Sequence, residues 1–344
     1  MSKRILAFGA GAIGSYVGGS LAAQGEEVVF FDRPEMKDHF EKSGIKIIHA
    51  DKSVSRIEKP EIIVSLNEIV DKKPFDYALM AVKSYDTENL MHQLVPFKKY
   101  IPPIVCLQNG VENEDIIQAI LGRNFSIPAS VTTAIGKKNG NTIVVEKLRG
   151  IGLSSESPLS PEIKSALNRA GLNCKLYRDA QAMKWSKMLT NLTSNALSAI
   201  LDLSPGEILK NKDLFKIDMG QIREALAVMA AYGIPVVDLP GTPVRLFAMA
   251  SKNLPLFLSQ PLLIKFIAKG RGEKMPSFHI DLKNGRGKSE VEYLNGAVVR
   301  FGENKNIKTP INRFLTETLL GITNGTIAWD EYRHKPQKVI NYFN

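Results

Sequence analysis

A glycine-rich turn directly after the first apolar segment constrains the fold of this chain more than any other feature. Arg4–Phe8 is predicted to be a short buried strand, and Gly9-Ala10-Gly11-Ala12-Ile13-Gly14 follows it with the spacing GxGxxG. Ile13–Gln24 then carries the apolar periodicity of a helix. A strand, this turn and a helix, in that order, open the nucleotide-binding half of a Rossmann sheet.

Each glycine of the turn has a separate task. Gly9 permits the tight turn, Gly11 lets a pyrophosphate approach the main chain, and Gly14 lets the helix pack on the strand. The N–H groups at the start of the helix, with its partial positive charge, would hold the phosphates. We therefore predict that all six residues bind a dinucleotide: Gly9, Ala10, Gly11, Ala12, Ile13 and Gly14. The alternative is a glycine-rich turn without a ligand.

The residues after the second predicted strand bear on the choice of nucleotide. Glu27–Phe31 is followed by Asp32 and Arg33. An acidic side chain here holds the ribose hydroxyls in NAD enzymes, whereas a guanidinium can pair with a 2′-phosphate and stack on adenine. The sequence carries both signals; Arg33 favours NADP(H), and Asp32 leaves NAD(H) open.

Short apolar segments alternate with amphipathic ones through the first half of the chain. Strands are predicted at Tyr77–Val82 and Ile104–Leu107, and helices at Thr87–Val95 and Asn113–Leu121. Buried strands that alternate with helices form a parallel sheet covered on both faces.

Three more strands are predicted further along, at Ile127–Ile135, Thr142–Val145 and Gly150–Leu153, with a turn at residues 138–141. They are expected to extend the same sheet. From Asp179 onward the pattern is helical nearly to the end, and 344 residues suit two domains. We therefore expect an α/β fold: an N-terminal Rossmann-type doubly wound sheet over residues 1–178 and a C-terminal all-α domain over residues 179–344.

Composition excludes several classes of protein. The two cysteines, Cys106 and Cys174, form neither a CxxC pair nor a disulfide framework. The net charge of +10 indicates either a solvated basic surface or a field that attracts anionic ligands. No nucleic-acid motif or signal peptide is recognisable. The most apolar run, Leu254–Ala268, is too short to cross a bilayer. A cytoplasmic protein is expected, and a homodimer through the helical domain would bury this run.

A row of polar residues interrupts an otherwise apolar helical segment. Lys187, Asn191 and Asn195 are spaced i, i+4 and i+8, so on one helix they lie along one face. A solvated face would more often carry Glu and Lys. The row is therefore a candidate active-site face, and a polar surface stripe or a capping network is the alternative.

With this row, three further segments complete a pattern that resembles the ketopantoate reductase family. They are Lys83-Ser84, Asn109-Gly110 and Ser289–Gly296 (SEVEYLNG), in the family's order. The match covers most of the chain. The resemblance implies a Rossmann domain and a helical domain with the active site between them. It also implies reduction of 2-dehydropantoate to pantoate with NADPH, a step toward pantothenate and coenzyme A.

The resemblance makes Lys187 and Glu290 the catalytic residues, with Lys187 as proton donor. Hydride arriving at a 2-oxo carbon leaves an oxyanion, which requires a cation and a proton close by. A lysine in a cleft can have its pKa lowered toward working pH by desolvation. Glu290 would orient Lys187 or contact the cofactor; the alternative is an ordinary surface glutamate beside Glu292.

The resemblance also assigns binding residues. One group would bind the substrate and another the cofactor, and Asn109, at the end of a predicted strand, would bridge ribose and substrate. The substrate group is Asn109, Lys187, Asn191, Asn195 and Ser277; the cofactor group adds Arg33, Lys83, Asn109, Gly136 and Glu290 to the glycine turn.

Two departures from the family leave the substrate open. Val236–Met275 is longer than in compact members and precedes Ser277, and Pro205 replaces an Asn near the substrate. Reduction of another 2-oxo acid or of an imine is therefore an alternative. A non-catalytic NADP-binding sensor is an alternative from a different class, which the Lys187/Asn191/Asn195 row with Glu290 disfavours because binding alone does not need a proton donor. The five histidines are scattered and no HExxH segment occurs, so no metal site is expected. No GxSxG segment occurs either, so a serine hydrolase is not expected.

Overall fold

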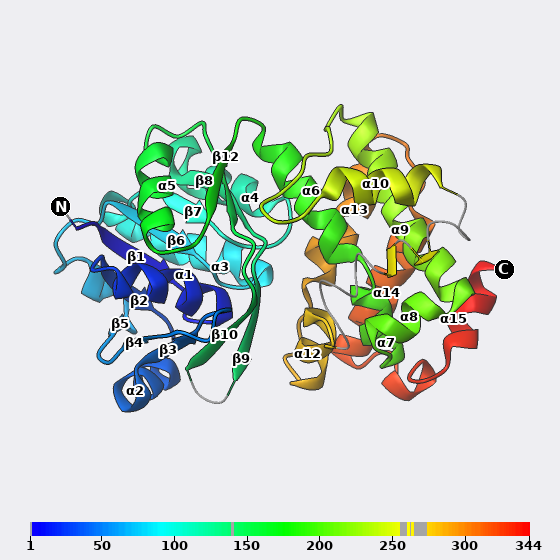
Figure 1. The fold of residues 1–344 in the computed structure, drawn as a ribbon, viewed down its shortest axis with the longest axis horizontal. Helices are drawn as coiled ribbons and strands as arrows, with labels where there is room; N and C mark the ends of the chain where they lie inside the picture. Colours follow the sequence, from blue (N-terminus) through cyan, green and yellow to red (C-terminus); the bar gives the residue numbers. More distant parts are fainter. Residues whose placement is uncertain (1, 139–140, 255–259, 262, 265–273) are drawn as a thin grey trace. The chain divides into compact units, whose positions relative to one another are not determined.

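The protein forms two compact units in a computed structural model that describes residues 2–138, 141–254, 260–261, 263–264 and 274–344 (Figure 1). The first unit contains Met1–Lys184 and Leu239–Thr242, and the second contains Trp185–Asp238 and Pro243–Asn344. Helix α6 (Ala180–Leu192) begins in the first unit and continues into the second. The first unit is built on β-sheets and the second is helical, as the sequence predicts.

An eight-stranded sheet forms the centre of the first unit. Its strands lie in the order β12-β11-β8-β7-β6-β1-β2-β5, and all neighbours are parallel except β8 and β11. The six parallel strands from β5 to β8 have the Rossmann order. The strands are β1 (Arg4–Phe8), β2 (Glu27–Phe31), β5 (Glu61–Ile63), β6 (Tyr77–Met80), β7 (Ile104–Cys106), β8 (Ser126–Val131), β11 (Ile151–Ser154) and β12 (Cys174–Tyr177).

A second, four-stranded sheet corrects one prediction. Its order is β4-β3-β10-β9, made of β3 (Ile45–Ile48), β4 (Val54–Ile57), β9 (Ala134–Lys138) and β10 (Thr142–Lys147). The single strand expected at Ile127–Ile135 is therefore divided: β8 stays in the main sheet, whereas β9 pairs with β10.

The break between β8 and β9 has a local cause. The Thr132 hydroxyl donates to the Gly150 carbonyl, and the Thr133 hydroxyl accepts from the Gly150 N–H, both at 2.9 Å. These bonds hold the chain where it leaves the main sheet. In the predicted turn at 138–141, Asn139 and Gly140 lie outside the described residues.

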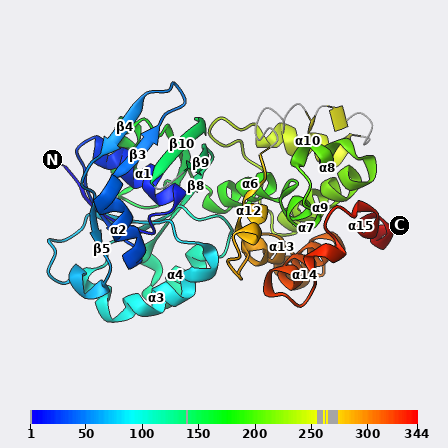
Figure 2. The same cartoon turned by 90° about the horizontal axis from the view of Figure 1, so that it is seen from below.

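Helices cover both faces of the main sheet (Figure 2). Because side chains alternate along a strand, β1 sends Ile5 and Ala7 into one core cluster and Leu6 and Phe8 into the other. α1 (Ala12–Ala23), α5 (Ser160–Arg169) and the small sheet lie on the first face, and α3 (Thr87–Leu94) and α4 (Asn113–Leu121) on the second. The remaining elements are α2 (Pro34–Ser43), η1 (Leu66–Ile69), η2 (Ser84–Asp86), η3 (Val95–Tyr100) and η4 (Arg123–Phe125).

The second unit packs its helices around α9 (Lys212–Ala231), which contacts α8, α10, α13, α14 and α15. Its other helices are α7 (Asn195–Leu201), α8 (Pro205–Lys210), α10 (Val244–Asn253), α12 (Ser277–Lys283), η5 (Glu290–Tyr293), α13 (Asn295–Asn304), α14 (Pro310–Asn324), η6 (Trp329–Glu331) and α15 (Pro336–Phe343). Most of the apolar run Leu254–Ala268 lies outside the described residues.

Among the described residues, no helix combines the length and apolarity that crossing a bilayer demands. Within the same ranges, no cluster of His, Cys, Asp and Glu has the geometry of a metal site.

Candidate functional site

The glycine turn connects β1 to α1 with the backbone geometry that its sequence predicts. Gly9 has φ +91°, a region that side chains rarely adopt, and a Cβ there would lie 3.0 Å from the Ala81 main chain. A Cβ on Gly14 would lie 1.8 Å from the Gly9 carbonyl oxygen, so only glycine permits this close packing of helix on turn. A Cβ on Gly11 would meet no protein atom within 4 Å.

The start of α1 fits a dinucleotide phosphate. Gly11 is the N-cap residue, and no side chain in the described ranges caps the helix. The buried Ser15 side chain points toward the glycine turn, since its hydroxyl donates to the Ala10 carbonyl at 2.9 Å. A helix N-terminus without a side-chain cap, beside a glycine with free space at its Cβ position, is a cradle for an anion. The residues present therefore fit a bound pyrophosphate.

Asp32 and Arg33 follow β2 and take different positions. The Asp32 carboxylate accepts from the Ala10 N–H at 2.5 Å and from the Arg33 N–H at 2.8 Å, so it is fixed beside the glycine turn. The Arg33 side chain is 83% exposed, with its Nε 3.8 Å from the Asp32 carboxylate. The acidic group is thus held by the main chain, and the guanidinium lies at the surface.

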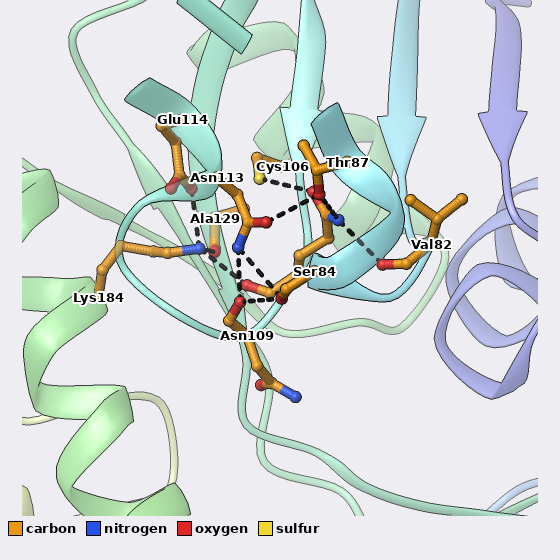
Figure 3. Close-up of polar contacts among 10 residues, drawn as sticks. Val82, Ser84, Thr87, Cys106, Asn109, Asn113, Glu114, Ala129 and Lys184 are labelled. Carbon is orange, nitrogen blue, oxygen red and sulfur yellow. Dashed lines mark hydrogen bonds and ion pairs between the residues drawn. The ribbon is translucent and has the colours of Figure 1, made fainter. Parts of the chain in front are cut away.

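The loops after β6 and β7 are joined by a buried hydrogen-bond network (Figure 3). The Asn109 carbonyl accepts from the Ser84 hydroxyl at 2.9 Å and from the Asn113 amide at 2.6 Å. The Gln108 amide donates to the Thr87 hydroxyl at 2.7 Å. In Figure 3 the Asn109 side chain is directed away from this network. The main-chain carbonyl of Asn109 is therefore held by hydrogen bonds, and its side-chain amide points away from them.

The two other predicted cofactor residues of this unit lie on different elements. Lys83 is the N-cap residue of η2, three residues after β6 ends at Met80. Gly136 lies in β9, opposite Val144, and β9 packs against α1. Lys83 thus lies with Asn109 at the carboxyl edge of the main sheet, whereas Gly136 belongs to the small sheet.

The polar row predicted on one helix is divided between two. Lys187 and Asn191 lie on α6, which ends at Leu192, and Asn195 is the first residue of α7. Ser194 breaks the helix because it takes the left-handed conformation, with φ 54°. Buried Asp218 stabilises this break by accepting from the Ser194 N–H at 2.8 Å and from its hydroxyl at 2.9 Å.

Asn195 and Ser277, both predicted to bind substrate, lie in contact within the second unit. The Asn195 amide lies 3.4 Å from the Ser277 hydroxyl, and its carbonyl oxygen accepts from the Phe278 N–H at 3.1 Å. Asn195 is buried. It therefore holds the start of α12 and positions Ser277.

Glu290, the second predicted catalytic residue, is 3% exposed, whereas Glu292 beside it is exposed. A buried carboxylate is costly unless it is bonded, so Glu290 is not an ordinary surface glutamate. It begins η5, where the Ser289 hydroxyl accepts from the Val291 N–H.

A largely buried series of polar side chains lies next to these residues, and no sequence pattern indicated it as a whole. Gln221 donates to Asp218 at 2.6 Å and accepts from Asn295 at 2.9 Å. Asn295 also donates to Asn312, which donates to Glu224 at 2.7 Å. This series of hydrogen bonds connects the break at Ser194 to α13, the helix that follows Glu290. Only Asn295, within SEVEYLNG, carried a signal in the sequence.

The fold and the dinucleotide cradle define an oxidoreductase with a Rossmann unit. The chain belongs to the ketopantoate reductase PanE/ApbA family: the family's sequence profile matches residues 5–154, and its C-terminal profile matches residues 179–323. A 2-dehydropantoate 2-reductase from Archaeoglobus fulgidus is 28% identical over 335 residues, which cover 94% of this chain and 99% of the relative.

Two solved structures share the fold. A PanE/ApbA family ketopantoate reductase from Ralstonia eutropha has a TM-score of 0.78 at 24% identity, covering 94% of this chain and 99% of that chain. A D-mandelate dehydrogenase, solved with NADH and anilino(oxo)acetate, has a TM-score of 0.76 at 21% identity, covering 94% of this chain and 98% of that chain. Both likenesses extend over the two units.

Proposed function

We propose that this protein reduces a 2-oxo acid with a nicotinamide cofactor, and that 2-dehydropantoate is the substrate and NADPH the reductant. The contact between Asn195 and Ser277 carries the proposal. Both residues are predicted to bind the substrate. They are 82 residues apart in the sequence, yet they lie in contact at the starts of α7 and α12. The name of the full-length Archaeoglobus fulgidus relative supports the substrate.

The chain's own residues divide the work of the proposed reaction. A bound reduced nicotinamide would supply a hydride to the 2-oxo carbon. Lys187 would stabilise the oxyanion that forms at C2 and donate the proton that converts it to a hydroxyl. Asn191, Asn195 and Ser277 would bind the substrate carboxylate and hydroxyl. Glu290 would orient Lys187 or contact the cofactor.

A substrate panel tests this function. The purified protein is mixed with NADPH or NADH and with 2-dehydropantoate, smaller 2-oxo acids, an aryl 2-oxo acid or an imine, and cofactor absorbance is followed. We expect the highest kcat/KM with 2-dehydropantoate. Preference for the aryl acid would replace this substrate with one like that of the D-mandelate dehydrogenase. Cofactor binding without turnover of any compound would establish the sensor function instead.

The cofactor proposal rests on Arg33, and a specific observation supports NADH as the second candidate. The Asp32 carboxylate is fixed beside the glycine turn by two N–H groups. An acidic group at this point binds ribose hydroxyls and repels a 2′-phosphate. Arg33 can outweigh this repulsion because its exposed guanidinium can reach a phosphate as a bidentate donor.

Arg33→Ala will raise the KM for NADPH about tenfold, the equivalent of about 1.4 kcal/mol for one lost charge-assisted contact. The KM for NADH will change little, because NADH has no 2′-phosphate. Steady-state kinetics with both cofactors measure this. Lys42→Ala, an exposed lysine in the last turn of α2, is the matched control. Equal losses for NADPH and NADH would contradict the assignment of Arg33.

A further inference from the structure

Lys184 is a buried lysine at the carboxyl edge of the main sheet (Figure 3). Its side chain is 5% exposed, and its Nζ donates to the Gln108 carbonyl at 2.8 Å and to the Ala129 carbonyl at 3.3 Å. The Glu114 carboxylate, 8% exposed, lies 2.8 Å from the same nitrogen. Of the three donors of the ammonium, two meet carbonyl oxygens, and the Glu114 carboxylate is its ion-pair partner.

This ammonium stays charged in the folded protein. Burial alone would lower the pKa of Lys184, but the adjacent Glu114 carboxylate outweighs burial and the pKa is raised. Lys184 is therefore unsuited to donate a proton, in contrast to the role proposed for Lys187.

One partner of Lys184, Gln108, lies in the loop after β7 that carries the predicted site residue Asn109. Gln108 precedes Asn109, whose carbonyl is held by Ser84 and Asn113. Asn113 and Glu114 form the first turn of α4. One ammonium thus joins the loop after β7, the interior of β8, the start of α4 and the first turns of α6.

Lys184 also lies on the helix that carries the proposed proton donor. α6 runs without interruption from Ala180 to Leu192. Lys187 follows Lys184 by three residues, which is less than one turn of this helix. The bonds of the Lys184 side chain therefore hold the first turn of α6, which belongs to the first unit.

We propose that Lys184, with Glu114, is a positioning residue of the reductase: it fixes the main chain before Asn109 through the Gln108 carbonyl, and it fixes the first turn of α6, the helix that carries Lys187. The proposal rests on the proposed function. A contact that served stability alone would not need charge, because an apolar pair of similar volume is often equally stable or more so. Apolar residues cannot donate to the Gln108 and Ala129 carbonyls, however, and a misplacement of about 1 Å can cost about a hundredfold in rate.

The test separates positioning from stability. Lys184→Met alone leaves the Glu114 carboxylate buried without its cation and can fail to fold. The double variant Lys184→Met/Glu114→Leu removes both charges and is expected to fold, with a somewhat lower melting temperature because the Gln108 and Ala129 carbonyls lose a donor. The matched control is Lys338→Met/Glu331→Leu, an exposed pair at the same 2.8 Å separation in the second unit.

Two measurements on the double variant decide the proposal. We expect kcat to fall at least about tenfold, with a displaced pH profile for kcat because Lys187 is less well placed. We also expect faster amide hydrogen exchange in residues 108–113 and 181–192, with no change in the control variant. A folded double variant with wild-type kcat, pH profile and exchange would overturn the proposal.

Hydrogen exchange also keeps this proposal distinct from the proposed function. If the wild type reduces no 2-oxo acid, the reductase function fails and the catalytic meaning of Lys184 fails with it. Faster exchange confined to residues 108–113 and 181–192 would still report the anchoring of these segments. If the wild type is active and the double variant has the same kcat, pH profile and exchange, the reductase function stands and positioning by Lys184 is wrong.

Discussion

Replacing Lys187 with alanine will lower kcat by about two or more orders of magnitude, because the general acid of the proposed reaction is removed. The oxyanion at C2 would then lose both its cation and its proton source. Cofactor affinity should change little, since the glycine turn proposed to bind the nucleotide belongs to the first unit. Turnover from cofactor oxidation and affinity from nucleotide fluorescence measure the two effects.

A matched lysine controls this experiment. Lys216 lies exposed on α9 of the same unit, so Lys216→Ala removes an equal charge without touching α6. Its kcat should equal that of the wild type. If Lys187→Ala also keeps near-normal turnover while folded, Lys187 is not the proton donor and the mechanism is wrong.

Gly11→Ala will abolish most cofactor binding and leave the fold intact. A Cβ on Gly11 meets no protein atom, so the melting temperature of the protein alone should stay within a few degrees of the wild type. The same Cβ would fill the space in which the proposed pyrophosphate approaches the main chain. We expect the Kd for NADPH to rise at least about a hundredfold, about 2.7 kcal/mol, as measured by calorimetry.

Gly14→Ala provides the contrast. Its Cβ would lie 1.8 Å from the Gly9 carbonyl oxygen, a clash between main-chain elements that no side-chain rotation relieves. Folding itself should therefore suffer, with a lower melting temperature even without cofactor. Tight NADPH binding by Gly11→Ala would show that the turn does not hold the pyrophosphate, whatever Gly14→Ala does.

The first unit was predictable because its signals are local. Strand β1, the glycine turn and α4 occur at the predicted residues, since buried parallel strands are continuous apolar runs. The small sheet was not predicted. Its strands β3 and β4 are short and partly exposed, and the departure of β9 from the main sheet depends on the hydroxyls of Thr132 and Thr133 bonding to Gly150.

The second unit was predictable as helical but not in its details. The spacing predicts that Asn195 lies on the same helix as Lys187. Nothing in the sequence indicated the left-handed break, because a serine such as Ser194 does not by itself indicate a positive φ. The break depends on Asp218, which lies 24 residues away on α9. Lys184 was missed for the same reason: a buried lysine and a surface lysine look alike in a sequence, and only the fold brings Glu114 to it.

The short segment Leu239–Thr242, which leaves the second unit and returns to it, limits how this protein can be dissected. The Thr132 hydroxyl lies 2.9 Å from the Pro240 carbonyl, and a Cβ on Gly150 would meet Pro240 at 2.8 Å. A gene truncated after codon 184 would encode a nucleotide-binding half that lacks this packed piece of its own surface. Domain swaps between family members should therefore exchange residues 239–242 together with the N-terminal part.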